Sequence, residues 1–171
     1  VVYVGESGQA LVPPPDLASA DGAQLIAALD LPNLAVRMRA TDELSDRLGA
    51  AAVDPLAAAL RNGAGQGLKI YGRWALLRLG ALGGEQLALA AGDSDPIVRI
   101  HAMRMSSETA ELTNELQSLV MAGLKDSSPD VRRAAADAAG RHPDLVLVPG
   151  LADVIREAPE NDVHLRHAAR I

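Results

Sequence analysis

Apolar and small side chains recur along the chain at intervals of four and then three residues, the spacing of one face of an α-helix. Val98, Ala102 and Met105 follow this spacing. Two further segments repeat it, the first with a slightly wider last step: Val36, Ala40 and Leu44, and Val131, Ala135 and Ala138. Helix-breaking residues separate these segments from shorter apolar stretches: Gly49, Asn62-Gly63, Gly80, Gly92 and His142-Pro143. The pattern therefore predicts antiparallel pairs of α-helices joined by turns.

The shorter apolar stretches predict the first helix of each pair. They lie at Leu25-Ile26-Leu29, Leu56-Leu60, Leu87-Leu89, Leu112-Leu116-Leu119-Val120 and Val154-Ile155. The third of these helices is expected to be short, from Glu85 to Ala91. Pro149 is expected to shorten or bend the start of the fifth. In the third and fourth pairs, Asp95 and Ser128 are expected to cap the second helix through their side-chain oxygens, with a proline next in the chain.

A five-residue order recurs in the second helix of each predicted pair: an aliphatic residue, a basic residue, two variable positions and a small residue. The basic positions are Arg37, Lys69, Arg99, Arg132 and Arg166, which lie 32, 30, 33 and 34 residues apart. Five copies at a nearly constant period are typical of a helical solenoid. The small residues of the first four copies are expected to be buried, because they let a neighbouring helix pack closely. They are Ala40, Gly72, Ala102 and Ala135.

These segments resemble the HEAT-repeat family, most closely at Asp93–Arg99 and Asp126–Arg132. The resemblance covers residues 21–171 and implies an all-α, right-handed, armadillo-like α-solenoid, or superhelix, of four to five HEAT-like hairpins. We expect the hairpins at about 21–49, 50–80, 81–107, 108–141 and 142–171. Residues 1–20 are expected to form a short extended segment or linker, in which Val1–Val4 is a strand left from a preceding β domain or packed on the solenoid.

Composition limits the functions that the chain can have. It has no cysteine, which excludes disulfides, thiolate metal sites, c-type haem attachment and a cysteine nucleophile within these residues. A net charge of −6 and only 2% aromatic residues argue against nucleic-acid binding. No apolar run approaches the roughly 18 residues of a membrane span. The chain begins at Val1 and stops at Ile171 within a helical pattern, so we expect a piece of a longer protein.

The recurring cations, Arg37 to Arg166, have two interpretations. They could form a positive stripe that binds an acidic partner or phosphate. Alternatively, they form a structural ladder in which each cation contacts a carboxylate or carbonyl of its own or the adjacent turn. We favour the ladder, because acidic residues recur in the same turns: Asp30, Asp93, Asp95, Asp126, Asp130 and Asp162. Such pairs fix the stacking register more than they add stability.

Other groups of polar residues are weaker candidates for chemistry. His164 and His167, with Asp162 or Glu160, lack the ligands of a complete metal site. Gly63–Gly67 is interpreted as a flexible loop, since it lacks the ending of a phosphate-binding loop. Asp93–Asp95 and Asp126–Ser128 resemble fragments of calcium loops but are expected to form turns and caps. His101, His142, the serines and the pair Glu111 and Glu115 show no catalytic pattern.

Tyr71 and Trp74 stand three residues apart in the second copy. In the repeat register they are expected to fill space within or between repeats. A partly exposed tryptophan on the concave face would instead be a natural point of contact with a partner, because aromatic side chains dominate binding energy at protein interfaces. We therefore name these two residues as the candidate partner surface.

A closer resemblance lies in the order of the segments. A terminal strand and a proline-bearing linker precede Leu25–Asn33, and Trp74–Leu82 and His164–Ile171 follow. This order resembles the HEAT region of large membrane-bound dehydrogenases of planctomycete-type bacteria. In that family a sugar-dehydrogenase-like β-propeller precedes the repeats and a haem-binding cytochrome c segment follows them. The resemblance implies an extracytoplasmic or membrane-associated bacterial protein, but it assigns no dehydrogenase or haem residue to this chain.

We therefore expect a non-catalytic scaffold that contacts a protein partner or neighbouring domains of the same chain, with no cofactor, no nucleic acid and no direct membrane insertion. Two alternatives stay open. HEAT-like units occur in phycobilin lyases, so the chain could be a lyase or an enzyme-associated domain, although no acid–base or nucleophile cluster supports this. It could also bind nucleic acid, as HEAT-like DNA glycosylases do, although charge and aromatic content argue against it.

Overall fold

The computed structural model describes residues 13–170, and every regular element in that range is helical. The prediction of an all-α chain is therefore confirmed. The strand expected at Val1–Val4 lies outside the described residues. Pro13–Asp16 has no regular structure, in keeping with the predicted linker, and the side chain of Leu17 is buried directly after it. Within the described range, no helix is both long enough and apolar enough to cross a membrane.

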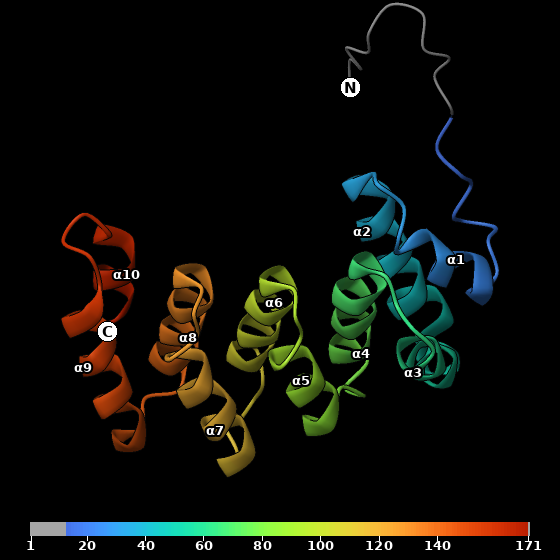
Figure 1. The fold of residues 1–171 in the computed structure, drawn as a ribbon. Coiled ribbons are helices and arrows are strands. Elements are labelled where there is room, and N and C mark those ends of the chain that lie inside the picture. Colours follow the sequence, from blue (N-terminus) through green and yellow to red (C-terminus); the bar gives the residue numbers. More distant parts are fainter. Residues whose placement is uncertain (1–12, 171) are drawn as a thin grey trace, which may run out of the picture.

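The helices follow one another as five antiparallel pairs in residues 13–170 (Figure 1). The first two pairs are α1 (Gly22–Ala28) with α2 (Leu34–Asp42) and η1 (Glu43–Leu48), and η2 (Gly49–Ala52) and α3 (Val53–Arg61) with η3 (Leu68–Gly72) and α4 (Arg73–Arg78). The next two are α5 (Gly84–Ala91) with α6 (Pro96–Ser107), and α7 (Asn114–Gly123) with α8 (Pro129–Arg141). The last is η4 (Leu145–Leu147) and α9 (Val148–Glu157) with α10 (Val163–Ala168).

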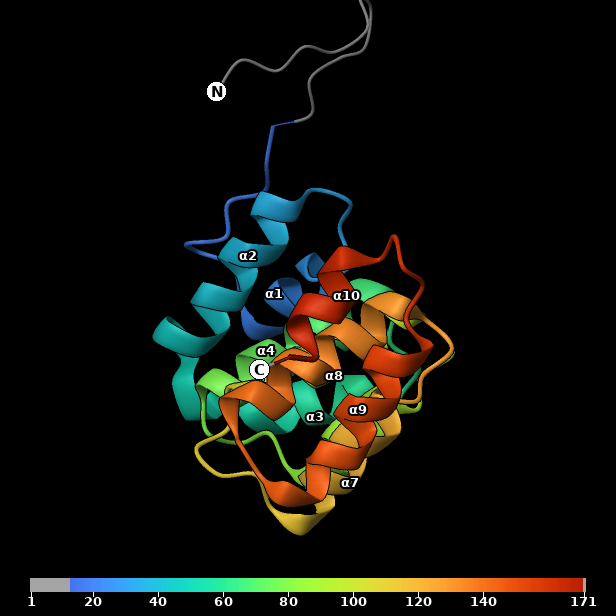
Figure 2. The ribbon, with the colours of Figure 1, turned by 90° about the vertical axis from the view of Figure 1, so that its left-hand side faces the viewer.

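The pairs stand side by side in a row (Figure 1). From the second pair onward, the second helices (α4, α6, α8 and α10) lie along one side of the row and the first helices along the other. The second helices pack on their own first helices and on the second helices of neighbouring pairs, as α6 does on α5 and α8. Figure 2, which looks along the row from α9 and α10, shows the pairs overlapping in succession.

Side-chain capping marks where several of the helices begin. Asp21 and Gln24 form a reciprocal capping box at α1. Asn33 caps α2, and Asp95 accepts a hydrogen bond from the Ile97 amide at the start of α6, as predicted. The prediction that the Ser128 side chain caps α8 is wrong. Its side chain makes no capping bond there, and the backbone amide of Ser128 instead donates to Asp126 Oδ1 at 2.8 Å.

The predicted apolar stripes form the core between the pairs. All nine of their residues are buried, from Val36 in the first pair to Ala138 in the fourth. The four small residues of the repeated segments, Ala40, Gly72, Ala102 and Ala135, are also buried, as predicted. A Cβ added to Gly72 would lie 2.9 Å from Leu68 Cδ1 and 3.5 Å from Leu56 Cδ2, so the position has no room for a larger side chain. Close packing of these helices therefore depends on small residues at this level.

The wider step from Ala40 to Leu44 keeps both residues on the same face, because residues four apart lie one above the other on a helix, and Leu44 is fully buried. Residues Glu43–Leu48 form the π-helical turn η1, which has a longer hydrogen-bonded ring than an α-helix. The short helix expected from Glu85 to Ala91 is α5, in which Leu87 and Ala90 are buried, whereas Leu89 lies on the opposite face and is 56% exposed.

Candidate functional site

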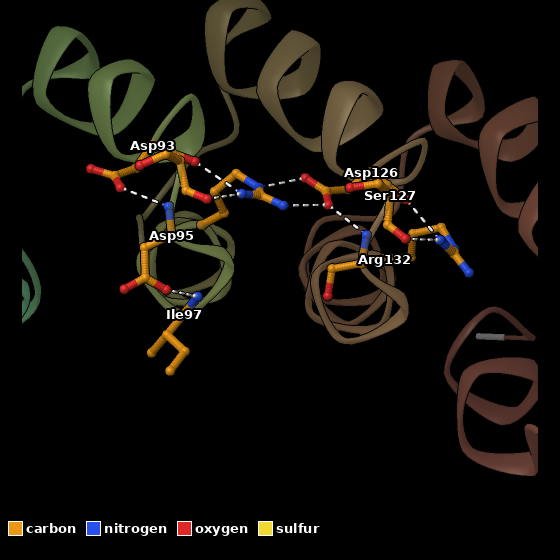
Figure 3. A network of polar contacts seen from close by, with 9 residues as sticks. Asp93, Asp95, Ile97, Asp126, Ser127 and Arg132 are labelled. Carbon is orange, nitrogen blue, oxygen red and sulfur yellow. Dashed lines mark hydrogen bonds and ion pairs between the residues drawn. The ribbon is translucent and has the colours of Figure 1, made fainter.

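Polar contacts follow one edge of the row, at the turns that join the first and second helix of each pair. Arg99, in α6, shows the full set. Its Nη1 donates to the carbonyl oxygens of Asp93 and Ser94 in its own turn, at 2.9 and 3.2 Å. Its Nε and Nη2 donate to Asp126 Oδ2 and Oδ1 in the next turn, at 2.7 and 2.9 Å. One side chain thus joins two pairs at this edge (Figure 3).

The same arrangement recurs in part at the neighbouring positions. Arg132 Nη1 donates to the carbonyls of Asp126 and Ser127 at 2.7 and 3.2 Å, repeating the contacts of Arg99 with its own turn (Figure 3). Lys69 Nζ lies 2.7 Å from Asp93 Oδ2 in the following turn, repeating the contact between pairs. Asp93 and Asp126 each precede the cation of their own pair by six residues. In these two turns, the residue six positions before the repeated cation therefore forms an ion pair with the cation of the preceding pair. We call it the receiving position.

Asp93 and Asp126 also shape their own turns. Asp93 Oδ1 accepts a hydrogen bond from the Asp95 amide at 2.9 Å, as Asp126 Oδ1 does from the Ser128 amide. The hydrogen bonds from Arg99 lower the pKa of Asp126 below its ordinary value. Burial opposes ionisation of Asp93, yet the hydrogen bonds from Lys69 and the Asp95 amide hold its pKa below the ordinary value. These acidic segments therefore form turns, as their sequence predicts.

The ladder changes at the last pair. Asp162 caps α10 by accepting from the Leu165 amide, and it lies 3.4 Å from Arg133 rather than near Arg132. Within residues 13–170, Arg166 makes only a long contact, 3.5 Å from Nη1 to the carbonyl of Ala158. Asp130 also pairs with Arg133, at 3.2 Å within α8. The cation that joins the fourth and fifth pairs is thus Arg133, which stands one residue after the repeated basic position.

Arg73 is a further structural cation that sequence reasoning missed. Its side chain is almost fully buried between the second and third pairs. Nε donates to the carbonyl of Gln86 in α5 at 3.0 Å, and Nη1 donates to the carbonyl of Lys69 at 2.8 Å. Burial lowers the pKa of its guanidinium, and the charge of Asp93 partly offsets this. No pattern around Arg73 in the sequence signals that it points inward.

The first pair departs from the ladder. Arg37 Nη1 donates to the carbonyls of Leu31 and Pro32 at 2.7 and 2.8 Å, as its counterparts do in their own turns. The position that should receive Arg37 in the following turn is Gly63, six residues before Lys69. No ion pair of Arg37 occurs within residues 13–170. Its guanidinium lies over the ring of Tyr71, with Cζ 5.1 Å from the ring centre.

A cavity of about 630 Å³ adjoins Arg37 and reaches the first three pairs. The lining includes Asp30 and Pro32 of the first pair, the loop glycines Gly65 and Gly67 with Gln66, Ile70 and Tyr71 of the second, and Ile97 and His101 of α6. Asp30 does not pair with Arg37. Its Oδ1 accepts a hydrogen bond from the Leu68 amide at 2.8 Å. The carboxylate of Asp30 therefore supplies the negative charge at the start of η3.

The two aromatic residues of the candidate partner surface lie at different places. Both are half-buried. Tyr71 lies under Arg37 in the cavity, whereas Trp74 Nε1 donates to His101 Nδ1 at 3.0 Å across the second and third pairs. Burial, helped by the nearby charge of Arg104, lowers the pKa of His101. His101 therefore has a hydrogen-bond partner in the structure, which no pattern in the sequence indicates.

The remaining candidates lie apart from one another. His164 and His167 lie on α10, and no group of three or more histidine, aspartate or glutamate side chains in the described residues could hold a metal ion. Ser45 and Ser106 donate to carbonyl oxygens one helical turn earlier. The loop predicted to be flexible at Gly63–Gly67 has two glycines in close contact with Leu29 and Asp30.

The ladder contact between Arg99 and Asp126 gives a prediction for stability. Both side chains are largely buried, at 15% and 13% exposure, so we expect a double-mutant cycle with Arg99→Ala and Asp126→Ala to give a coupling of about 1–2 kcal/mol in urea unfolding at pH 7. Arg104→Ala, an exposed cation on the same helix, is the control and should show no coupling with Asp126→Ala. A coupling near zero for Arg99 would contradict the role of the ladder.

The same pair should make stability depend on pH. Because the folded pKa of Asp126 is lowered, its contribution is complete above the unfolded carboxyl pKa of about 4 and is lost as pH falls through the folded value. We therefore expect the stability difference between wild type and Asp126→Asn to shrink between pH 6 and pH 2.5. A difference that stays constant over this interval would show that the charge of Asp126 has no part in it.

Comparison with known proteins adds no further assignment to this geometry. No protein-family model matches the chain, and none of the curated proteins is significantly similar to it.

Proposed function

We propose that the chain is a right-handed, HEAT-like α-solenoid and acts as a non-catalytic scaffold for a protein partner or for neighbouring domains of its own polypeptide. The stacked pairs, the small residue buried at the same level in four of them and the turn contacts that recur between them support this architecture. Stacked repeats give an extended surface whose outward positions can vary while the core stays constant. Such a surface suits recognition of another polypeptide.

The observation that supports this function most is the contrast between buried and outward positions on the second helices. The buried positions repeat the same aliphatic and small residues. Half-buried and exposed positions instead change their chemistry from pair to pair: Tyr71 and Trp74 on η3 and α4, His101 and Arg104 on α6, and Asp137 on α8. A constant core beneath a varied surface is what a specific binding face requires.

The charges on the second helices favour a protein partner over a nucleic acid. The second helices contain most of the lysine and arginine residues of the chain, but acidic side chains neutralise many of them. Arg78 contacts both Asp42 and Asp46, at 2.6 and 3.0 Å, and Arg141 lies 3.4 Å from Glu108. A polyanion binds through unpaired cations that release counterions. A surface on which cations and carboxylates form ion pairs instead suits a partner that has polar groups of both signs.

Within this function, the resemblance to planctomycete-type dehydrogenases places the chain between a β-propeller and a cytochrome c segment of a membrane-associated protein. The order of Leu25–Asn33, Trp74–Leu82 and His164–Ile171 supports this context. The full-length reading frame tests it. A bladed all-β region upstream and a Cys-x-x-Cys-His motif downstream are expected, and a frame with neither would overturn the context without affecting the scaffold.

Site-specific cross-linking tests the scaffold itself. We would place p-benzoylphenylalanine at Arg104 or Asp137 on the second helices, and at Leu89 or Ser118 on the first helices as controls, all four being exposed. In the native host, irradiation should link the first two positions to one defined polypeptide segment, identified by mass spectrometry. The two control positions should give no such product. Equal products from both layers, or none from either, would contradict a binding face on the second helices.

A further inference from the structure

We propose that the cavity beside Arg37 binds the carboxylate of an acidic side chain in a partner polypeptide. This inference rests on the proposed scaffold function and names the chemistry of one of its contacts. It starts from the difference between Arg37 and the turn cations of the second and third pairs. Lys69 and Arg99 each pair with an aspartate of the next turn, Asp93 and Asp126 respectively. Arg37 donates to the carbonyls of its own turn, but the residue at the receiving position of the next turn is Gly63, which has no side chain.

Open space lies beside Arg37. A Cβ built on Gly63 would have no heavy atom within 4 Å, apart from its chain neighbours, so no other element packs against that position. The loop residues that follow, Gly65 and Gly67, line the cavity of about 630 Å³ together with Arg37. In the second and third pairs, the corresponding cations Lys69 and Arg99 instead have an aspartate partner at 2.7 Å. The chain thus shows, at Arg99, the kind of group that Arg37 lacks.

The guanidinium of Arg37 retains unused donors. Nη1 is bound to two carbonyls, whereas Nε is buried and has no hydrogen-bond partner, and Nη2 has none within residues 13–170. Nη2 is the donor that a ligand can reach first, because solvent does not reach Nε. His101 lines the same cavity, and its Nδ1 accepts from Trp74. Neutral His101 therefore has its proton on Nε2, which can donate to a ligand oxygen.

The lining also limits the charge and shape of the ligand. Asp30 adds one negative charge, so a doubly charged phosphate would meet more repulsion than a single carboxylate. Ile70 and Ile97 lie in the same cavity, and Ile97 is 46% exposed. A ligand that fills the cavity thus presents a carboxylate next to an aliphatic group. An aspartate or glutamate flanked by leucine or isoleucine in an extended partner segment has this chemistry.

NMR titration of the whole ¹⁵N-labelled chain tests the site. The probe is acetyl-Leu-Asp-Leu-amide, and the matched control peptide has asparagine in place of aspartate. We expect the aspartate peptide to shift the Nε–H resonance of Arg37 and the amides of residues 63–71, with an affinity about tenfold or more above that of the control. Arg37→Gln should abolish the difference between peptides, whereas Arg156→Gln, at an exposed cation on α9 away from the cavity, should preserve it. Equal affinities of the two peptides for wild type would overturn the proposal, whatever the variants do.

Further measurements distinguish a polypeptide carboxylate from a free carboxylate or phosphate. They also distinguish a failure of this site from a failure of the scaffold function. Sodium acetate should shift the same resonances far more weakly than the aspartate peptide, and inorganic phosphate should leave them unchanged. Acetate as strong as the peptide would overturn the assignment to a polypeptide ligand, and stronger binding of phosphate would overturn the carboxylate. If cross-linking at Arg104 or Asp137 persists in Arg37→Gln while the peptides show no preference, the scaffold stands and this site does not.

Discussion

Replacing Gly67 by alanine should lower the free energy of unfolding by about 3 kcal/mol or more, the largest effect expected of a glycine-to-alanine change among residues 13–170. A Cβ at this position would overlap the carbonyl oxygen of Leu29 and would lie 2.9 Å from Asp30 Oδ1. The first contact is with backbone, which cannot turn aside as a flexible side chain can. The first two helix pairs would have to separate, and the hydrogen bond from the Leu68 amide to Asp30 would lengthen.

Gly84→Ala is the matched control for this change. Gly84 begins α5, and a Cβ there would have no heavy atom of a neighbouring element within 4 Å. Because alanine favours helix more than glycine, the control should be neutral or stabilising by up to about 1 kcal/mol. Urea unfolding followed by circular dichroism measures both variants. A Gly67→Ala protein as stable as Gly84→Ala would show that the turn after α1 does not pack on this loop as described.

The helix pairs could be predicted from the sequence because their signals are local. Spacings of three and four residues identify the buried faces around Val98 and Val131, and proline marks the start of α6 and α8. The burial of Ala102 and Ala135 could be predicted because a small residue occupies the same position in successive repeated segments. Each of these inferences needs only residues within one or two helical turns, together with a period that recurs along the chain.

Contacts between pairs were harder to predict, because they join residues that are distant in sequence. The turn cations were expected to contact carboxylates or carbonyls, but nothing in the sequence separates Arg99, which contacts both, from Arg37, which contacts carbonyls alone. The inward position of Arg73 and the bond between Trp74 and His101 also depend on how one pair is rotated on the next. Asp30 shows the same limit, because it caps η3 of the following pair rather than balancing a cation.

Residue type alone did not decide two local details. Ser128 has the residue type and backbone conformation of a cap, yet its side chain makes no capping bond, whereas Asp95 caps α6 from an equivalent turn. Leu89 is apolar but lies one residue before the position that faces the core. Side-chain type alone does not decide between neighbouring positions on a short helix such as α5, where a single turn offers few residues to fix the buried face.

Ala102→Leu should lower the free energy of unfolding by about 1–3 kcal/mol, because it forces a large side chain into a packed contact between neighbouring pairs. Ala102 is fully buried in one apolar cluster with Ile70 and Ala90 of the preceding elements and Ala135 of the next pair. None of these neighbours can leave the cluster without opening a cavity elsewhere. The added atoms would therefore push α6 away from α8, which is its principal packing partner.

Arg104→Leu places the same new side chain two residues further along the same helix, at an exposed position. This control should change stability by no more than about 0.5 kcal/mol, since it adds no atoms to the core. Thermal and urea unfolding of the two variants beside wild type give the comparison. Equal midpoints for all three proteins would mean that the small residue does not set the distance between neighbouring pairs, and the register assigned to all five repeated segments would then be wrong.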